Sequence, residues 1–128
     1  MDSIINGIDL SNFLKAREVF ERFRKNLTTD QEKAGAVQAF EFCYELSWKT
    51  MKRVLEKRGI ETRSPRDAFR EAALNKLISN PETWFLFIEK RNLSSHTYKE
   101  ENMESIVSIF DLFSNSLTEL VRNIELSK

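Results

Sequence analysis

Apolar residues recur at intervals of three and four along most of this chain, and this spacing constrains the fold more than any other feature. Such spacing places the apolar side chains on one face of an α-helix. Gly and Pro number only 3 and 2 among 128 residues, so the turns that a many-stranded sheet requires are scarce. We therefore predict an all-α fold, and an all-β fold is excluded.

Helix-start signals divide the chain into four to five helices. The first helix follows a cap at Asp9 or Ser11 and ends near Asn26, and the second runs from the capping box Thr29 to Glu32 as far as Gly59. The third and fourth helices begin at Ser64-Pro65 and Asn80-Pro81. The last helix follows a capping box from Thr97 to Glu100. The fourth helix is expected to end before Ser94. In the last helix, apolar residues from Met103 to Ile124 alternate strictly by three and four.

Helices of this length joined by short turns predict one antiparallel up-and-down bundle. The length of 128 residues corresponds to a single domain spanning residues 1–128, and we expect residues 1–8 to be a frayed N-terminus. Apolar side chains outside the main helical stripes, such as Phe42, Leu46, Val107 and Val121, favour a homodimer or a higher homo-oligomer.

Charge and cysteine content limit the class of protein. Lys plus Arg and Asp plus Glu each number 20, so the net charge is 0, which argues against a bulk nucleic-acid binder and requires any anion site to be local. Cys43 is the single cysteine, and the N-terminal sequence lacks the basic segment of a secretory signal. The longest apolar run, Trp84 to Ile88, is far shorter than the ~20 residues that span a membrane. We expect a cytoplasmic protein without a membrane segment.

The sequence lacks the motifs of many enzyme classes. It contains no glycine-rich phosphate loop, no paired cysteines and no pair of histidines, so we expect no metal and no cofactor. His96 is the single histidine. Taken alone, a histidine beside a helix start is more often a surface or capping residue than a catalytic one.

The residues around His96 change this interpretation because hydrogen-bonding side chains are concentrated there. They are Arg91, Asn92, Ser94, Ser95, His96, Thr97 and Tyr98. On an unbroken helix, side chains five residues apart differ by about 140° in direction, so Arg91 and His96 can converge only across a helix break. The serines and the predicted cap at Thr97 supply a break, and we predict a local site there for an anion such as a phosphodiester.

Other candidate residues have a structural and a functional interpretation. Glu41, Glu45 and Lys49 could bind a ligand, but one-turn spacing is more typical of a solvated helix face with an intrahelical ion pair. Trp48 and Trp84 could stack on a base, but both lie on apolar stripes, which favours the core.

Two further features remain open in the same way. Cys43 is interpreted as a small buried hydrophobe rather than a nucleophile. The segment from Lys49 to Glu71 holds eight basic and four acidic residues, a surplus that could guide RNA or an acidic partner, although cations are also ordinary at a helix C-terminus.

Three segments resemble the HEPN superfamily. The segment from Arg91 to Tyr98, RNLSSHTY, is similar to the R-x4-H-x-Y signature, with the polar Asn92 after the arginine. The segment from Phe40 to Lys49, FEFCYELSWK, and the tripeptide Ser64-Pro65-Arg66 resemble the subgroup of nucleotidyltransferase substrate-binding proteins. Together these segments cover nearly the whole chain from the second helix to the last.

The resemblance implies an HEPN-like bundle, usually dimeric, that works with a separate nucleotidyltransferase chain. One implied role is a non-catalytic subunit that holds a nucleotide or substrate without cleaving it, similar to the helical C-terminal domain of kanamycin nucleotidyltransferase. The other is a metal-independent ribonuclease toxin whose antitoxin, the nucleotidyltransferase, adenylylates the tyrosine of the motif. The implied catalytic residues are Arg91, Asn92 and His96, and the implied binding or modification residues are Tyr98, Ser95 and Thr97.

The ribonuclease role makes chemical demands on these residues. Metal-free RNA cleavage needs an acceptor for the proton of the 2′-hydroxyl, a donor for the departing 5′-oxygen and positive charge at phosphorus. Arg91 can supply the charge. Histidine titrates near neutral pH, so two copies of His96 in a dimer can share the proton transfers, unless water or Tyr98 is the second carrier. An adenylylated Tyr98 would place a bulky anion beside Arg91 and His96 and block the phosphate position.

Overall fold

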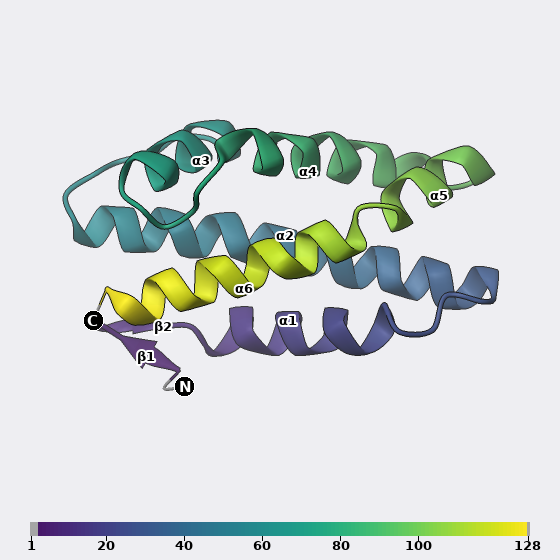
Figure 1. Cartoon of the computed structure of the whole chain (residues 1–128), viewed down its shortest axis with the longest axis horizontal. Coiled ribbons are helices and arrows are strands. Elements are labelled where there is room, and N and C mark those ends of the chain that lie inside the picture. The colour runs from purple at the N-terminus through teal and green to yellow at the C-terminus, as the bar shows by residue number, and fades with distance from the viewer. Residues whose placement is uncertain (1–2, 128) are drawn as a thin grey trace.

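The structure, a computed structural model, describes residues 3–127 and consists almost entirely of helices (Figure 1). The helices are α1 (Ser11–Phe23), α2 (Asp30–Lys57), α3 (Pro65–Leu74), α4 (Pro81–Leu93), α5 (Glu100–Val107) and α6 (Phe110–Leu126), with a short 3-10 helix, η1 (Ser94–His96), between α4 and α5. Two short strands, β1 (Ile4–Ile5) and β2 (Ile8–Asp9), pair antiparallel before α1. The prediction of an all-α bundle is confirmed.

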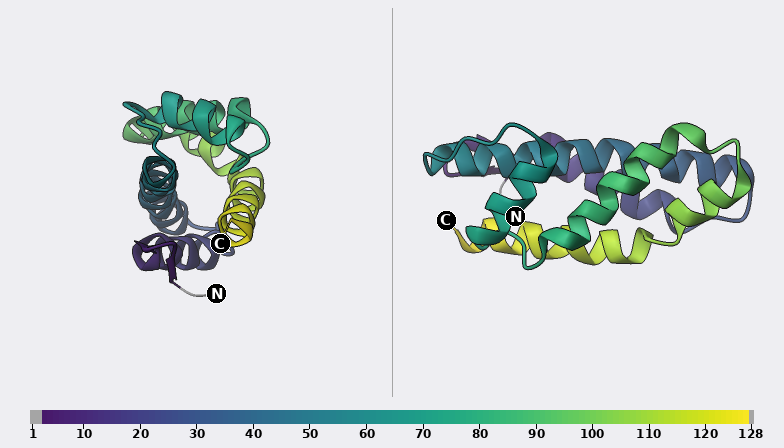
Figure 2. Two further views of the ribbon diagram at one scale, coloured as in Figure 1. Left: turned by 90° about the vertical axis from the view of Figure 1, so that its left-hand side faces the viewer. Right: turned by 90° about the horizontal axis from the view of Figure 1, so that it is seen from above.

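Four helices enclose the core. Seen end-on, α1, α2, α4 and α6 form the four sides of the bundle, and α3 lies beside α4 (Figure 2). α1 and α4 run in one direction along the long axis, while α2 and α6 return (Figure 1). The ring of Phe113 on α6 lies 5.0 Å from that of Phe20 on α1, 4.9 Å from that of Phe40 on α2 and 5.0 Å from that of Phe87 on α4. One aromatic side chain therefore joins all four sides of the bundle.

The helix boundaries follow the predicted capping signals closely. Thr29 and Glu32 form a complete capping box at the start of α2, and the side chains of Ser64 and Asn80 accept backbone amide hydrogens at the starts of α3 and α4. Gly59 follows α2 with φ at 81°, the left-handed conformation that ends a helix. α1 ends at Phe23, three residues before the predicted end.

The N-terminal segment differs from the expectation. We expected residues 1–8 to fray, but residues 4–9 form the strand pair. Asn6 and Gly7 have φ values of 51° and 81°, which are those of a tight two-residue hairpin turn, and an Asn-Gly pair is its usual sequence. Ile5 and Ile8 are buried against the end of the bundle, so hydrophobic contact stabilises the hairpin. The first two residues of the predicted frayed segment lie outside the described residues.

The last helix also differs, because it is two helices rather than one. The backbone leaves the helical path between Val107 and Phe110, and α5 and α6 point in different directions (Figure 1). The hydroxyl of Ser108 donates to the carbonyl oxygen of Ser105 at 2.6 Å, a local bond that competes with helical hydrogen bonding. This break allows α5 to pack against α2 and α4.

The predicted capping box from Thr97 to Glu100 is wrong. α5 begins at Glu100 after Lys99, and no side chain caps it. Thr97 lies instead in the turn that follows η1. The start of α5 is held by the amide of Asn102, which donates to the carbonyl oxygen of His96 at 2.9 Å.

The end of α3 generates a stability prediction. Lys76 is exposed and has φ at 64°, and a side chain in this region costs about 1–2 kcal/mol. We expect Lys76→Gly to raise the free energy of unfolding by about 0.5–1 kcal/mol, after the greater entropy of the unfolded glycine chain is subtracted. Urea unfolding followed by circular dichroism measures the change.

The matched control is Gly59→Ala, at the equivalent position after α2. Nothing lies within 4 Å of a Cβ added there, so the expected loss of about 1 kcal/mol reflects backbone conformation alone. A glycine at position 76 that leaves stability unchanged or lowers it would contradict the assignment.

Candidate functional site

Arg91 lies in the last turn of α4 and is held in place by two side chains. Its Nη1 atom lies 3.0 Å from Oε2 of Glu41 on α2 and 3.1 Å from Oγ of Ser94. The Arg91 and Glu41 side chains remain 39% and 26% exposed, so the ion pair is reachable from solvent. The guanidinium is therefore fixed in orientation at the surface of the bundle.

Ser94 is the connection point of this cluster. Its hydroxyl is within hydrogen-bond distance of the Glu41 carboxylate at 2.9 Å and of the Arg91 carbonyl oxygen at 2.6 Å, and it accepts from the Arg91 guanidinium. A hydroxyl has one proton, so it donates to one of these two acceptors at a time. Ser94 is buried and begins η1, where α4 ends. Ser94 therefore lies where α4 ends and also orients Arg91, the last arginine of that helix.

The predicted break between Arg91 and His96 is confirmed as the 3-10 helix η1. His96 ends η1 and is exposed, as is Tyr98, whose surface is 78% accessible. The two rings lie 6.1 Å apart between centroids with an angle of 76° between their planes, an edge-to-face contact. Within residues 3–127, no hydrogen bond or ring contact joins Arg91 to either ring. The structure therefore pairs His96 with Tyr98 and, separately, Arg91 with Glu41.

The remaining predicted residues surround this turn. Asn92 and Ser95 are exposed, and the Ser95 hydroxyl donates to the Asn92 carbonyl oxygen at 3.2 Å. Thr97 is half-buried in the turn that separates the two rings. Neither the side chain of Asn92 nor that of Thr97 is engaged by another described side chain, so both can reach a ligand.

Tyr44 lies beneath the site and was missed by sequence reasoning. Burial raises the pKa of the Tyr44 phenol well above its usual range, and the charge of Glu45 raises it further, while Arg91 and Arg66 lower it. The phenol is therefore neutral at physiological pH. The positive charges of Arg91 and Arg66 thus both influence the buried Tyr44 side chain.

Sequence reasoning also missed the partnership of Glu41. It grouped Glu41 with Glu45 and Lys49 on one helix face, and the expected ion pair between Glu45 and Lys49 is present at 3.4 Å. Glu41 instead contacts Arg91 on another helix. Helical spacing within α2 carries no information about that contact, because it depends on how α2 and α4 pack.

The structural interpretations of the other candidates are supported. Trp84 is 1% exposed, and Trp48 is half-buried at the edge of the core. Cys43 is fully buried, and burial raises the pKa of its thiol to about 12. Trp84 and Cys43 are therefore not available at the surface, while Trp48 is only partly covered.

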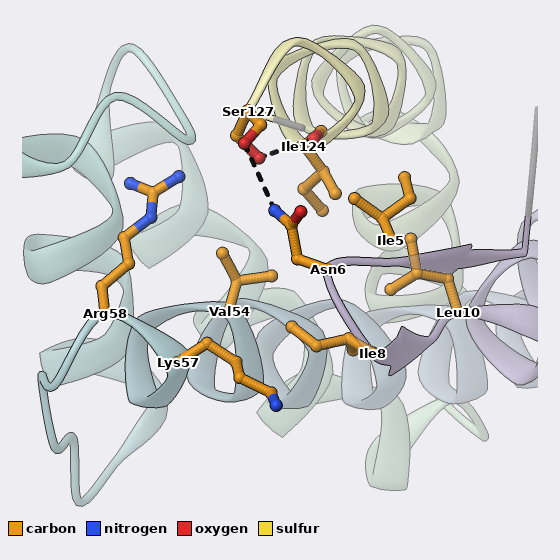
Figure 3. Close-up of a pocket in the computed structure, with 9 residues that line it drawn as sticks. All are labelled: Ile5, Asn6, Ile8, Leu10, Val54, Lys57, Arg58, Ile124 and Ser127. Atoms are coloured by element: carbon orange, nitrogen blue, oxygen red, sulfur yellow. Dashed lines mark hydrogen bonds between the residues drawn. The ribbon is translucent and has the colours of Figure 1, made fainter.

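A cavity of about 330 Å³ lies at the other end of the bundle, between the hairpin and the C-terminal ends of α2 and α6 (Figures 1 and 3). Its walls are partly apolar and partly polar, with Lys57 and Arg58 on one side, and Asn6 donates to the carbonyl oxygen of Ser127 at 3.2 Å. None of the residues from Arg91 to Tyr98 lines it. The cavity is thus separate from the candidate site.

Among residues 3–127, no group of three or more His, Cys, Asp or Glu side chains lies close enough together to hold a metal ion. No described helix combines the length and apolar character needed to cross a membrane.

Comparisons with known proteins concern the family and the fold. Residues 9–125 match the model of a family described as nucleotidyltransferase substrate binding protein like. Probable ribonuclease HepT of Haemophilus influenzae is 40% identical over 85 residues, a match that covers 62% of this chain and 58% of that protein. The match thus spans little more than half of the curated relative.

Two solved structures share the fold. One, from Haemophilus influenzae, is described as revealing the fold of a substrate binding domain of a nucleotidyltransferase; it is 30% identical with a TM-score of 0.75, over 90% of this chain and 95% of that chain. The other, from Thermus thermophilus, is 23% identical with a TM-score of 0.82, over 88% and 98% of the two chains, and supports the fold alone.

The burial of Cys43 generates a reactivity prediction. Because the thiolate is the reactive form and burial raises the pKa of the thiol to about 12, we expect iodoacetamide at pH 8 to alkylate the folded protein more than about a hundredfold more slowly than the protein in concentrated urea. Mass spectrometry over time measures the rates. Lys25→Cys, at an exposed position, is the positive control, and rapid alkylation of Cys43 in the native protein would contradict the assignment.

Proposed function

Because this chain belongs to the nucleotidyltransferase substrate-binding protein family, we propose that it is the RNA-cleaving partner of a separate nucleotidyltransferase in a cytoplasmic, toxin–antitoxin-like system. One observation carries the proposal: a fixed arginine, Arg91, lies in the last turn of α4, and the segment that follows the helix exposes a histidine and a tyrosine to solvent. These side chains provide the charge and the proton carriers that metal-free phosphodiester cleavage needs.

The proposed reaction is transfer of the phosphoryl group to the adjacent 2′-oxygen. A general base removes the proton of the 2′-hydroxyl, and the 2′-oxygen then forms a bond to phosphorus. The bond from phosphorus to the 5′-oxygen breaks, and a general acid protonates that oxygen. The products are a 2′,3′-cyclic phosphate and a 5′-hydroxyl, and the Arg91 guanidinium stabilises the charge that develops on the phosphoryl oxygens.

The proton transfers need two carriers, and each chain has one histidine. We assign one transfer to His96 and the other to His96 of a second subunit in a homodimer. His96 is exposed, so a second copy can approach it. Asn92, Ser95 and Thr97 can contact the ribose and the neighbouring phosphate.

Tyr98 is assigned as the modification site that switches the activity. Tyr98 is 78% exposed, which suits attack of its phenol on the α-phosphorus of ATP in the active site of the nucleotidyltransferase. The phenolic oxygen forms the new bond to phosphorus, pyrophosphate leaves, and the phenolic proton passes to a base. AMP on Tyr98 adds negative charge next to His96 and competes with RNA for the site.

A non-catalytic binding subunit is the second candidate, and one observation favours it. The Arg91 guanidinium is already paired with Glu41 at 3.0 Å, so this carboxylate competes with a phosphate for the arginine. In this alternative the turn holds a nucleotide or an acceptor substrate without cleaving it. Addition of the chain would then raise the affinity of the nucleotidyltransferase for its acceptor.

Cleavage in the absence of metal tests the first candidate. We expect the unmodified protein to cleave single-stranded RNA in EDTA and to leave 2′,3′-cyclic phosphate ends, and we expect His96→Ala to lower the rate by at least about a hundredfold, because one proton carrier is lost. Gel electrophoresis and mass spectrometry of the products measure both effects. Specific activity should also fall on dilution through dissociation of the dimer.

The matched control is Lys99→Ala, an exposed residue of the same turn, which should retain activity. Arg91→Lys keeps a positive charge beside Glu41 but loses the planar fork, and it should slow cleavage while the melting temperature stays close to that of the parent protein. RNA that stays intact with the unmodified protein would exclude the ribonuclease and leave the binding subunit.

Modification of Tyr98 is tested with the partner. After incubation with the nucleotidyltransferase and ATP, we expect one AMP per chain on Tyr98, located by peptide mass spectrometry, together with loss of RNA cleavage. Tyr98→Phe should stay unmodified because it lacks the phenolic oxygen. AMP on another residue, or a modified protein that remains active, would contradict the switch.

A further inference from the structure

Two arginines on α3 converge on one aromatic ring of α4. The guanidinium carbons of Arg66 and Arg70 lie 4.4 Å and 5.6 Å from the centroid of the Phe85 ring. Both arginines are exposed and Phe85 is half-buried. Like charges one helical turn apart repel each other, and the contact of both guanidiniums with the ring offsets part of this repulsion. We call these three residues the Arg66–Phe85–Arg70 cluster.

Neither guanidinium in the cluster is neutralised. Within the described part of the chain, no ion pair or hydrogen bond involves the side chain of Arg66 or Arg70. Asp67, which lies between them in sequence, accepts the backbone amide hydrogen of Arg63 instead. A guanidinium stacked on a ring keeps its N–H groups free at the edge. The cluster therefore presents two sets of unused donors suited to phosphate oxygens.

One residue of the cluster, Phe85, lies on the same helix as the start of the candidate site. Phe85 and Asn92 are seven residues apart on α4, which places them on nearly the same face about 10.5 Å apart. α3 and α4 form one side of the bundle (Figure 2), and the charges of Arg66 and Arg91 both act on Tyr44. A ligand longer than one nucleotide can therefore extend from Asn92 to the cluster.

We propose that the Arg66–Phe85–Arg70 cluster is a second phosphate subsite, which binds the backbone of single-stranded RNA next to the nucleotide held at Arg91 and His96. The inference rests on the proposed function, because it takes RNA as the ligand. Binding at two separated subsites makes affinity depend on strand length. It also sets the direction in which the strand crosses α4.

The chemistry of the cluster favours a nucleic-acid strand over an acidic protein surface. Arginines with a partly accessible aromatic ring match the alternation of phosphates and bases in a single strand. One RNA strand can also occupy both the cluster and the proposed phosphodiester site at the end of α4. Docking of an acidic face of the nucleotidyltransferase is the competing outcome, and the experiment separates the two.

The test measures binding of single-stranded RNA by fluorescence anisotropy across a range of salt concentrations. The ligands are a labelled ten-nucleotide strand and a labelled dinucleotide, both 2′-O-methylated so that neither can be cleaved. In R66Q/R70Q we expect affinity for the ten-nucleotide strand to fall by about tenfold or more. The slope of log K against log salt should become shallower by about 1.4, the loss of two phosphate contacts. Affinity for the dinucleotide should not change.

Two variants control for charge and for stacking. K15Q/K25Q removes two exposed positive charges from α1 and the loop after it, on the opposite side of the bundle from α3 (Figure 1), and should leave both ligands bound as before. R66K/R70K keeps the charges but loses the planar forks, and it should retain the salt slope while affinity falls severalfold. Circular dichroism and melting temperature confirm that each variant is folded.

The outcomes distinguish the two proposals. If the parent protein binds the longer strand with the expected loss in R66Q/R70Q but never cleaves RNA, the subsite stands and the ribonuclease falls. If the parent cleaves RNA and R66Q/R70Q binds with unchanged affinity and slope, the subsite is overturned and the ribonuclease stands. Loss of nucleotidyltransferase binding with RNA binding unchanged, or no RNA binding by the parent, also overturns the subsite.

Discussion

The packing of Phe113 is the constraint on which the rest of the structure depends. Its ring contacts aromatic rings from all three other core helices, with Phe20, Phe40 and Phe87 the nearest on each. Close-packed aromatic contacts of this kind tolerate little displacement, so the relative positions of α2 and α4 are set in the core. Phe40 is next to Glu41, and Phe87 is one turn before Arg91. The same packing that forms the core therefore brings the carboxylate to the guanidinium.

The site is formed where the regular structure stops. α4 ends at Leu93, and the buried Ser94 occupies the first position at which the chain can turn while its hydroxyl still contacts Arg91. The 3-10 helix then rotates the following residues, which exposes His96 and Tyr98 on the outside of the bundle. A continuous helix would place these rings on faces dictated by helical periodicity. In the short irregular segment, the directions of the His96 and Tyr98 side chains are therefore not set by helical periodicity, as they would be in the four core helices.

The sequence predicts what depends on local chemistry and misses what depends on packing. Thr29, Ser64 and Asn80 are visible as caps because their side chains bond to amides within three residues, and the cluster around His96 is contiguous. The contact of Glu41 with Arg91 joins residues fifty positions apart and leaves no periodic trace. The break at Ser108 was missed because apolar spacing continues across it, and the hairpin was missed although the Asn-Gly pair at Asn6 signals it.

The arginines on this side of the bundle differ in how they are held, and the difference suits different tasks under the proposed function. Arg91 is oriented by Glu41 and Ser94, so a phosphate meets a guanidinium whose geometry is already fixed, although the carboxylate reduces the net attraction. Arg66 and Arg70 contact the Phe85 ring and have no ion-pair partner among the described residues. Their charge therefore attracts a polyanion more strongly than that of Arg91 does, and over a longer distance. It fixes the position of the polyanion less closely. Under the proposed function, the arginines on α3 would attract the strand, and Arg91 at the end of α4 would position the reacting phosphate. The total net charge of 0 does not conflict with the proposed RNA ligand, because the positive charge in this arrangement is local.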